Sequence, residues 1–220
     1  MAQTQIKEKP KPLTITDFPP YLIDTLARAD EKGILCPPVD LMFSAFRTDP
    51  DEVKVVILGQ DPYHTPGKAN GLAFGYHPDY DGRLDASLFN IIKEIYESTG
   101  QKVTDFSLRS WADQGVLLLN TRLTTEVGRP LAHKKLGYEE MIKDYISHLS
   151  QYHDNLVFML WGKEAESYRT AIHAEGGHLT LITSHPSPYS ADLGFLGCGH
   201  FATANVFLAD HGKRPIRWGE

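Results

Sequence analysis

Four short runs of apolar residues divide the chain, and each is followed by polar or turn-forming residues. The runs are Val53–Leu58, Val116–Leu119, Leu156–Leu160 and Leu179–Thr183. They are brief and rich in branched side chains, a pattern typical of strands that are buried on both faces. We therefore expect four strands of a parallel sheet.

The intervals between these runs carry apolar residues at helical spacing. One helix is predicted from residues that share a face: Leu88, Ile91, Ile92 and Ile95. Ser87 is placed to cap it. A second helix is expected over residues 138–149, and a third over Glu164–Glu175, ended by Gly176 and Gly177. Strands that alternate with helices predict an α/β fold with three layers (αβα) around a central four-stranded parallel sheet.

Polar side chains follow the ends of the predicted strands. The segments concerned are Gly59–His64, Asn120–Thr121, Trp161–Lys163 and Ser184–Pro188. Ligands of open α/β sheets bind outside the carboxyl ends of the strands. A carboxylate, a carboxamide and imidazoles are therefore expected to converge on one edge of the sheet, which marks a candidate site.

Asp61 and His185 are the candidate catalytic residues at this edge. An Asp before a proline is usually a turn residue, but a carboxylate at a strand end can also act as a general base or stabilise a cationic sugar. A histidine in a turn is often structural. Here Pro186 and Pro188 stiffen the backbone around His185, which suits an imidazole that stabilises negative charge.

Asn120 and Phe74 are candidate residues for holding a base. A carboxamide presents a donor edge and an acceptor edge, which complements a base that offers a ring N–H beside a carbonyl. Phe74 stands among small residues in Gly71–Gly75. An isolated Phe is most often core, but its face could also stack on a flat ring.

Composition and charge place limits on the class of protein. The chain has 220 residues, is 41% hydrophobic and has a formal net charge of −6. Its length suits one globular domain, expected over residues 13–220, after a loose N-terminal tail over residues 1–12. The acidic balance argues against a nucleic-acid protein, although local charge matters more than the total. Cys36 and Cys198 alone cannot form a thiolate zinc site or a four-Cys iron–sulfur cluster.

Several blocks of sequence occur together in a recognisable order. They are Gly59–His64 (GQDPYH), Gly71–Phe74 (GLAF), Leu117–Asn120 (LLLN), Leu160–Gly162 (LWG), His185–Pro188 (HPSP) and Gly194–Phe201 (GFLGCGHF). In wording, order and spacing the chain resembles the family 1 uracil-DNA glycosylases, from about Asp17 to its C-terminus. The resemblance implies an enzyme that flips uracil out of DNA and hydrolyses its glycosidic bond, with no metal or cofactor.

The resemblance also implies roles for the pocket residues. Asp61 activates or orients the attacking water and supports the sugar cation, and His185 stabilises the uracil anion at O2 as a neutral donor. Asn120 reads the N3 and O4 edge, Phe74 stacks under the ring, and Tyr63 fills the space of thymine's methyl group.

Two further residues have implied roles near the pocket. Gln60 shapes the pocket through its backbone, and His64 lies near the water or a phosphate.

The DNA-binding loops depart from the family pattern. Ser187 and Ser190 are implied to hold phosphates, but the usual wedge leucine is Tyr189 and a basic residue is replaced by Leu193. The proline-rich loop appears as Leu84–Ser87, which retains only Ser87, and the Gly-Ser loop reads Gly162-Lys163. We therefore expect a stronger preference for single-stranded DNA than a typical member shows.

Two other functions stay open at this point. A catalytically silent DNA-binding relative could act as a scaffold, and its sequence would be expected to lack Asp61 or His185. A nucleotide-processing α/β enzyme would be expected to carry a glycine-rich phosphate loop or clustered acids for magnesium, and we find neither.

Partners and location follow from the same observations. The expected partners are uracil-containing DNA, single- or double-stranded, and a DNA-mimicking inhibitor protein, with the chain acting as a monomer. No apolar run is long enough to cross a bilayer, and the first residues lack the apolar core of a secretory signal. A cytoplasmic location away from membranes is expected.

Overall fold

The computed structural model describes residues 8–220, and the predicted α/β architecture is confirmed. Four parallel strands form the central sheet in the order β3-β2-β5-β6. Their bounds are Val55–Gly59 (β2), Val116–Asn120 (β3), Val157–Trp161 (β5) and Leu179–Thr183 (β6). Three of these strands end one residue later than the apolar runs, because Gly59, Asn120 and Trp161 continue the backbone pairing. The residues at the ends of the paired strands therefore lie directly beside the candidate site.

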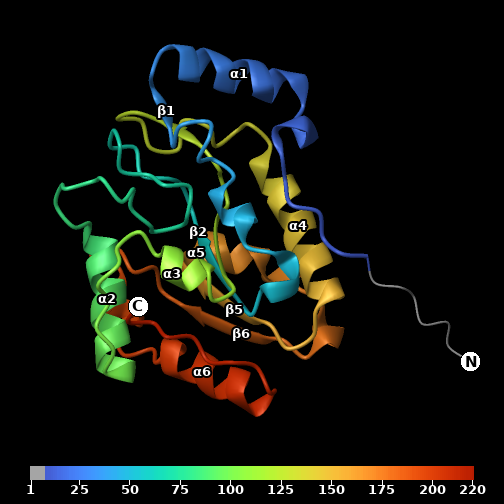
Figure 1. Ribbon diagram of the computed structural model, residues 1–220, viewed down its shortest axis with the longest axis vertical. Helices are drawn as coiled ribbons and strands as arrows, with labels where there is room; N and C mark the ends of the chain where they lie inside the picture. Colours follow the sequence, from blue (N-terminus) through green and yellow to red (C-terminus); the bar gives the residue numbers. More distant parts are fainter. Residues whose placement is uncertain (1–7) are drawn as a thin grey trace, which may run out of the picture.

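The helices cover both faces of this sheet. The connection from β2 to β3 contains α2 (Ala86–Thr99), and the connection from β3 to β5 contains α4 (Tyr138–Tyr152). These connections run in opposite directions across the sheet, and right-handed crossovers therefore place the two helices on opposite faces. The last helix, α6 (His200–Asp210), packs against α2 and against β5 and β6 (Figure 1). This arrangement gives the three predicted layers.

The remaining elements are short, apart from one helix near the N-terminus. The other helices are α1 (Pro20–Glu31), α3 (Arg109–Ala112) and α5 (Gly162–Glu166). A two-stranded antiparallel sheet pairs β1 (Leu35–Cys36) with β4 (Thr125–Glu126). Single 3₁₀ turns occupy Ile15–Asp17, Ser44–Arg47, Pro50–Glu52, Ser167–Ala171, Ala174–Gly176 and Ala191–Leu193.

Two local predictions were wrong. The cap of α2 is Asp85, whose carboxylate accepts a hydrogen bond from the Ser87 backbone N–H, so Ser87 lies inside the first turn. The helix expected over Glu164–Glu175 is broken into α5 and two 3₁₀ turns. The Ser167 and Thr170 hydroxyls donate to backbone carbonyls three residues earlier, which competes with a continuous helix.

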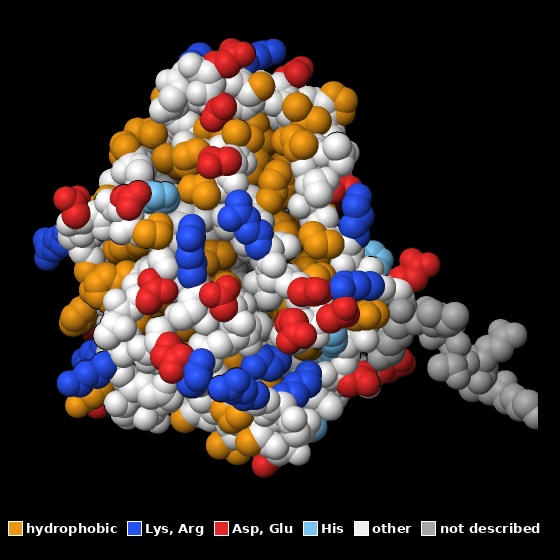
Figure 2. Space-filling model, viewed as in Figure 1, with side chains coloured by type: hydrophobic (Ala, Val, Ile, Leu, Met, Phe, Trp, Pro, Cys, Tyr) orange, Lys and Arg blue, Asp and Glu red, His pale blue; other side chains and the backbone are white. Residues whose placement is uncertain are grey.

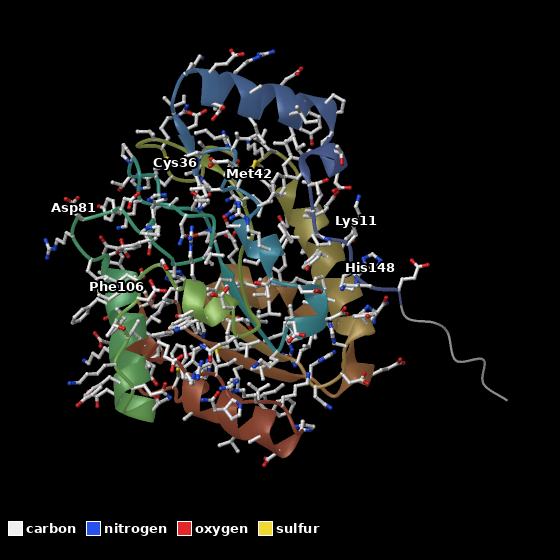
Figure 3. The ribbon with its side chains drawn as sticks, in the orientation of Figure 1. Lys11, Cys36, Met42, Asp81, Phe106 and His148 are labelled. Carbon is white, nitrogen blue, oxygen red and sulfur yellow. The ribbon has the colours of Figure 1, made fainter. Side chains whose placement is uncertain are left out.

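One hydrophobic cluster extends from Phe18 to Trp218. Under α1, Met42 is fully buried and Cys36 nearly so (Figure 3). The tail predicted over residues 1–12 lies partly outside the described residues, which begin at residue 8. Within the described part, Pro10 is buried and Lys9 forms ion pairs with Asp49 and Asp51. In residues 8–220 no helix is both long and apolar enough to cross a membrane.

Candidate active site

A cavity of about 300 Å³ opens at the carboxyl ends of β2 and β3. Eight residues predicted from the sequence line it: Gln60, Asp61, Tyr63, His64, Phe74, Ser87, Asn120 and His185. The structure therefore brings together side chains from segments up to 125 residues apart in the chain (from Gln60 to His185). A cavity of this size is at the small end of ligand pockets, which suits a single small ring.

One carboxylate oxygen of Asp61 is hydrogen-bonded, and the other is unpaired. Its Oδ2 accepts a hydrogen bond of 2.7 Å from the Leu131 backbone N–H. Its Oδ1 is buried without a hydrogen-bond partner in the protein. Burial raises the pKa of Asp61, while the Leu131 N–H and the positive charge of Arg122 act in the opposite direction. Asp61 lines the cavity, so its unpaired oxygen is the acceptor available to a water molecule that is admitted beside it.

His185 is held in one tautomer by the backbone of its own loop. The Ser187 backbone N–H donates to His185 Nδ1 at 3.0 Å, so Nδ1 carries no proton. In the neutral ring the proton must then lie on Nε2. Burial lowers the pKa of His185, which favours this neutral form. The imidazole is therefore a fixed neutral donor on the wall of the cavity.

Asn120 ends β3 with its side chain buried and its carboxamide uncommitted. Among residues 8–220 this carboxamide makes no hydrogen bond, so its donor and acceptor remain free for a ligand. Gly59 on the neighbouring strand makes room for it, since a Cβ there would lie 2.3 Å from Asn120 Oδ1 and 2.8 Å from the Ala73 Cβ. The glycine of the GQDPYH block is thus required by the close approach of the Asn120 side chain.

Two aromatic side chains form further walls of the cavity. Phe74 has a left-handed backbone (φ 64°), a conformation that non-glycine residues seldom adopt and that is often found at functional sites. Its ring contacts the rings of Trp161 and His185, with centroids 5.7 and 6.2 Å away. The Tyr63 hydroxyl donates to the Phe74 carbonyl at 3.2 Å. This bond ties the two aromatic walls together.

A polar network behind the cavity was missed by the sequence reasoning. Glu164 of α5 accepts hydrogen bonds from the Gln60 carboxamide, from Thr121 Oγ1 at 2.9 Å and from the Arg122 guanidinium at 2.6 Å. The hydrogen bonds and the charge of Arg122 lower the pKa of Glu164, although burial opposes them. Arg122 lies two residues after Asn120, the last residue of β3. This position just after a strand end is the sequence feature that could have marked Arg122 as part of the site.

Another missed contribution comes from the loop that follows β4. Pro130 and Leu131 line the cavity, and Leu131 also has a left-handed backbone (φ 60°). Its N–H is the donor to Asp61, 70 residues away in sequence. Nothing local in the sequence marks this residue, because its contribution is a backbone group. His64, by contrast, was predicted and lies exposed at the rim.

The loop after β6 combines internal hydrogen bonds with two exposed apolar side chains. Ser190 Oγ donates to the His185 carbonyl at 2.8 Å, and Ser187 Oγ lies 3.0 Å from Ser190 Oγ. Because Ser190 has used its only hydrogen, Ser187 is the donor between them. Tyr189 and Leu193 are 94% and 77% exposed on this loop. The hydroxyls thus brace the loop, while the two apolar side chains face outward.

Gly162 and Lys163 lie beside the cavity rather than in its wall. They line a neighbouring hollow together with Gln60 and His185. Gly162 has a left-handed backbone (φ 85°), and a Cβ there would lie 2.9 Å from the His185 Cβ. The glycine therefore allows α5 to begin directly against His185, while Lys163 is exposed.

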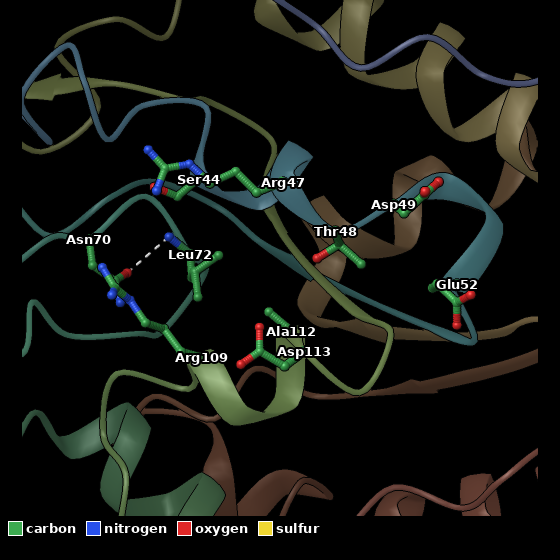
Figure 4. Close-up of a pocket in the computed structure, with 10 residues that line it drawn as sticks. All are labelled: Ser44, Arg47, Thr48, Asp49, Glu52, Asn70, Leu72, Arg109, Ala112 and Asp113. Carbon is green, nitrogen blue, oxygen red and sulfur yellow. Dashed lines mark hydrogen bonds between the residues drawn. The ribbon is translucent and has the colours of Figure 1, made fainter.

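Two other hollows differ from this site in the chemistry of their walls. One of about 440 Å³ has Arg47 and Arg109 on one side and the carboxylates of Asp49, Glu52 and Asp113 on the other (Figure 4). A second, of about 700 Å³, lies near the amino end of β2 and mixes basic and acidic residues. Figure 2 shows the same mixture, with Lys and Arg gathered near α6 below a group of Asp and Glu. Neither hollow includes Asp61, His185 or Asn120.

Fold and cavity together define the class of protein. It is an α/β enzyme whose site offers an acceptor for water, a neutral imidazole donor, a free carboxamide and an aromatic wall. A model of the uracil DNA glycosylase superfamily matches residues 46–209. The chain belongs to this superfamily.

Individual relatives agree with the family. The chain is similar to a uracil-DNA glycosylase of Pseudomonas fluorescens, 47% identical over 83% of this chain and 78% of the relative. It is also similar to one of Borrelia hermsii, 48% identical over 84% of this chain and 83% of the relative. Among solved structures, mimivirus uracil-DNA glycosylase aligns over 90% of this chain and 80% of its own, with a TM-score of 0.82 and 28% identity.

Proposed function

We propose that this chain removes uracil from DNA by hydrolysing the bond between the base and its deoxyribose, which leaves an abasic site and starts base excision repair. The observation that carries the proposal is the pairing of Asp61 and His185 in one cavity. One offers a carboxylate oxygen without a hydrogen-bond partner, and the other a donor fixed on Nε2. The similarity to named uracil-DNA glycosylases supports the same conclusion.

The two groups suit opposite ends of the reaction. Cleavage of the glycosidic bond leaves positive charge on the sugar and negative charge on the departing base. The Asp61 carboxylate stabilises the sugar cation and accepts a proton from the attacking water. The His185 Nε2–H donates to uracil O2, where the negative charge develops. Neither group needs a metal for this chemistry.

Recognition of uracil uses the other walls of the cavity. The free Asn120 carboxamide accepts from N3–H and donates to O4, and Phe74 stacks on the ring. Tyr63 occupies the space that the methyl group of thymine would need. Gln60, which Glu164 holds in place, shapes the pocket, and His64 at the rim lies near the water or a phosphate.

The DNA strand is proposed to cross the rim of this cavity. Ser87, Gly162 and Lys163 lie beside it, and Ser187 and Ser190 bind phosphates by exchanging their mutual hydrogen bond for contacts with the DNA. Asp85 would repel phosphates if its charge faced the DNA uncompensated. In the structure its carboxylate lies 3.7 Å from the Lys68 ammonium and caps α2, which offsets its charge.

Residues 13–220 are proposed to form a single domain that acts as a monomer. The proposed location of the protein is the cytoplasm, where it would meet its DNA substrate. A DNA-mimicking inhibitor protein is a further proposed partner, since mimivirus UNG variants have been solved in complex with UGI. The inhibitor would cover the same rim, including the exposed Tyr189.

One experiment separates this proposal from its alternatives. Purified protein is incubated with a uracil-containing oligonucleotide in EDTA, and abasic sites are scored by alkaline cleavage. The glycosylase is expected to form them without metal. A silent DNA-binding scaffold predicts binding without abasic sites, and a magnesium-dependent nucleotide enzyme predicts no product under these conditions.

Asn120→Asp is expected to weaken uracil release and to allow slow release of cytosine. The carboxylate loses the N–H donor for O4, while cytosine presents an amino donor at that position. Free bases released from matched uracil and cytosine oligonucleotides can be separated by chromatography. Uracil release at the wild-type rate would remove Asn120 from base recognition.

Tyr189→Ala is expected to slow cleavage in duplex DNA roughly tenfold, with a much smaller effect on single strands. Opening a duplex costs a few kcal/mol, and a side chain inserted into the vacated stack recovers part of it, with aromatic stacking contributing ~1–3 kcal/mol. Tyr189 is exposed and free to insert. The wild type should also prefer single strands, because Leu193 supplies no charge for the flanking phosphates.

The comparison requires matched single- and double-stranded substrates of one sequence. Val206→Ala, which truncates an exposed apolar side chain on α6, serves as the control and should leave both rates unchanged. An equal loss on both substrates for Tyr189→Ala, or no loss on either, would rule out the wedge assignment.

A further inference from the structure

A buried lysine stands directly behind the tyrosine wall of the cavity. The Lys68 side chain is 6% exposed. Its ammonium lies over three tyrosine rings, 4.3 Å from the Tyr63 centroid, 4.5 Å from Tyr76 and 5.5 Å from Tyr80. It also lies 3.7 Å from an Asp85 carboxylate oxygen. We call these five residues the Lys68 cluster.

The cluster joins two walls of the cavity. Tyr63 and Asp85 line the cavity, whereas Lys68, Tyr76 and Tyr80 do not. The Tyr63 and Tyr76 rings meet edge to face, with centroids 5.2 Å apart, and the Tyr76 hydroxyl contacts the Asp85 backbone N–H. Lys68 and Tyr76 therefore both connect the Tyr63 ring to Asp85, the N-cap of α2.

The backbone fixes where Lys68 stands independently of these ring contacts. The Lys68 carbonyl accepts from the His77 N–H at 2.8 Å, and Ala69 forms an isolated bridge with Tyr76. The side chain is thus directed toward the rings by a short paired segment. Its burial excludes a direct contact with DNA phosphates, so any effect of Lys68 on the substrate must pass through the residues that it touches.

The positive charge of Lys68 is stabilised by its surroundings, although it is buried. Burial lowers the pKa of Lys68, and the Asp85 carboxylate opposes that effect. An ammonium over the face of an aromatic ring is attracted by the ring quadrupole, and the attraction grows when the pair is desolvated. The Tyr63 ring is consequently held by the ammonium on its face, by Tyr76 on its side and by the Phe74 carbonyl at its hydroxyl.

We propose that Lys68 is a positioning residue for base selection: its ammonium holds the Tyr63 ring rigidly in the wall of the cavity, so that the methyl group of thymine is excluded. This inference rests on the proposed uracil-releasing function. A side chain that excludes a base by one methyl group must stay in place. If the Tyr63 ring could move away, the larger base would fit. Rigidity of Tyr63 is therefore the property that Lys68 supplies.

The test compares release of thymine and uracil from single-stranded oligonucleotides of one sequence in long incubations. Lys68→Met keeps an unbranched side chain, one atom shorter, and removes its charge. It is expected to raise the ratio of thymine to uracil release at least tenfold, while uracil release falls less than threefold. Tyr63→Ala is the positive control and should release thymine. Lys93→Met, at an exposed position of α2, is the matched control and should leave the ratio unchanged.

Two further variants separate positioning from folding. In the double variant Lys68→Met with Tyr63→Ala, thymine release should equal that of Tyr63→Ala alone, because Lys68 acts through Tyr63 and the two effects are not additive. Lys68→Arg retains a cation and should remain closer to the wild-type ratio than Lys68→Met. Lys68→Gln is used if the methionine variant does not fold, and the same rise is expected.

The outcomes are distinct. An unchanged ratio in the neutral Lys68 variants, while Tyr63→Ala releases thymine, would overturn the inference and leave the proposed function intact. Continued rejection of thymine by Tyr63→Ala would overturn it as well, since Tyr63 would not be the side chain that excludes thymine. If the wild type releases no uracil, the proposed function itself fails.

Discussion

Asp61→Asn is expected to slow single-turnover uracil release about a hundredfold or more, the scale of losing one acid–base or electrostatic contribution. Asparagine can keep the hydrogen bond from the Leu131 N–H with its carbonyl oxygen. Its NH₂ group then occupies the place of the unpaired Oδ1. A donor replaces the acceptor that takes the proton from water, and the negative charge opposite the sugar cation is lost.

The affinity for DNA and the pH dependence of the rate add two further expectations for Asp61. Affinity for uracil-containing DNA should survive in Asp61→Asn, because the phosphate contacts lie on other loops. In the wild type, the rate should fall on acidification as the pH drops through the raised pKa of Asp61, since only the ionised group accepts a proton. Asp144→Asn, at an exposed position of α4, is the matched control. Wild-type rates for Asp61→Asn would remove the residue from the mechanism.

His185→Ala should cause a loss of similar size, about a hundredfold or more in single-turnover cleavage. The variant removes the Nε2–H that stabilises the departing uracil anion. It also leaves the Ser187 backbone N–H without its Nδ1 acceptor, so loop order is checked separately by hydrogen exchange. His148→Ala, on the exposed side of α4, should behave as the wild type.

The choice of base gives a second readout for His185. Its contribution depends on how much negative charge the leaving group carries. A uracil analogue that leaves more easily, such as a 5-fluorinated base, should therefore be affected less by His185→Ala than uracil itself. An equal loss for both bases would show that His185 does not act on the leaving group.

The parts of the fold and site that could be predicted are those that depend on the local sequence pattern. A buried parallel strand is apolar throughout, so the first polar residue after each run marks the edge of the sheet. That signal identified Asp61, Asn120 and the segment containing His185, and the fold brings all three to one cavity. Three strands end one residue later than predicted because backbone pairing continues through residues such as Gly59. The need for a glycine at this position could not be predicted, because it comes from the close approach of the Asn120 side chain.

The contacts that tune these residues could not be predicted from local pattern. Leu131 acts through its backbone N–H and reaches Asp61 across 70 residues. Glu164 accepts hydrogen bonds from three partners, although it was predicted only as the first residue of a helix. Lys68 would be assigned to the surface by its residue type, but three tyrosine rings and Asp85 enclose its charge. Each depends on segments that meet only in the folded chain.

Detection of the free base is the decisive test of uracil release by this chain. Wild-type protein and Asp61→Asn, purified in parallel, are incubated in EDTA with a single-stranded oligonucleotide that contains one labelled uracil, and the released base is identified by chromatography. We expect free uracil and an equal amount of abasic DNA from the wild type, with about a hundredfold slower release from Asp61→Asn. No free uracil from the wild type, or equal release by both proteins, would contradict this expectation.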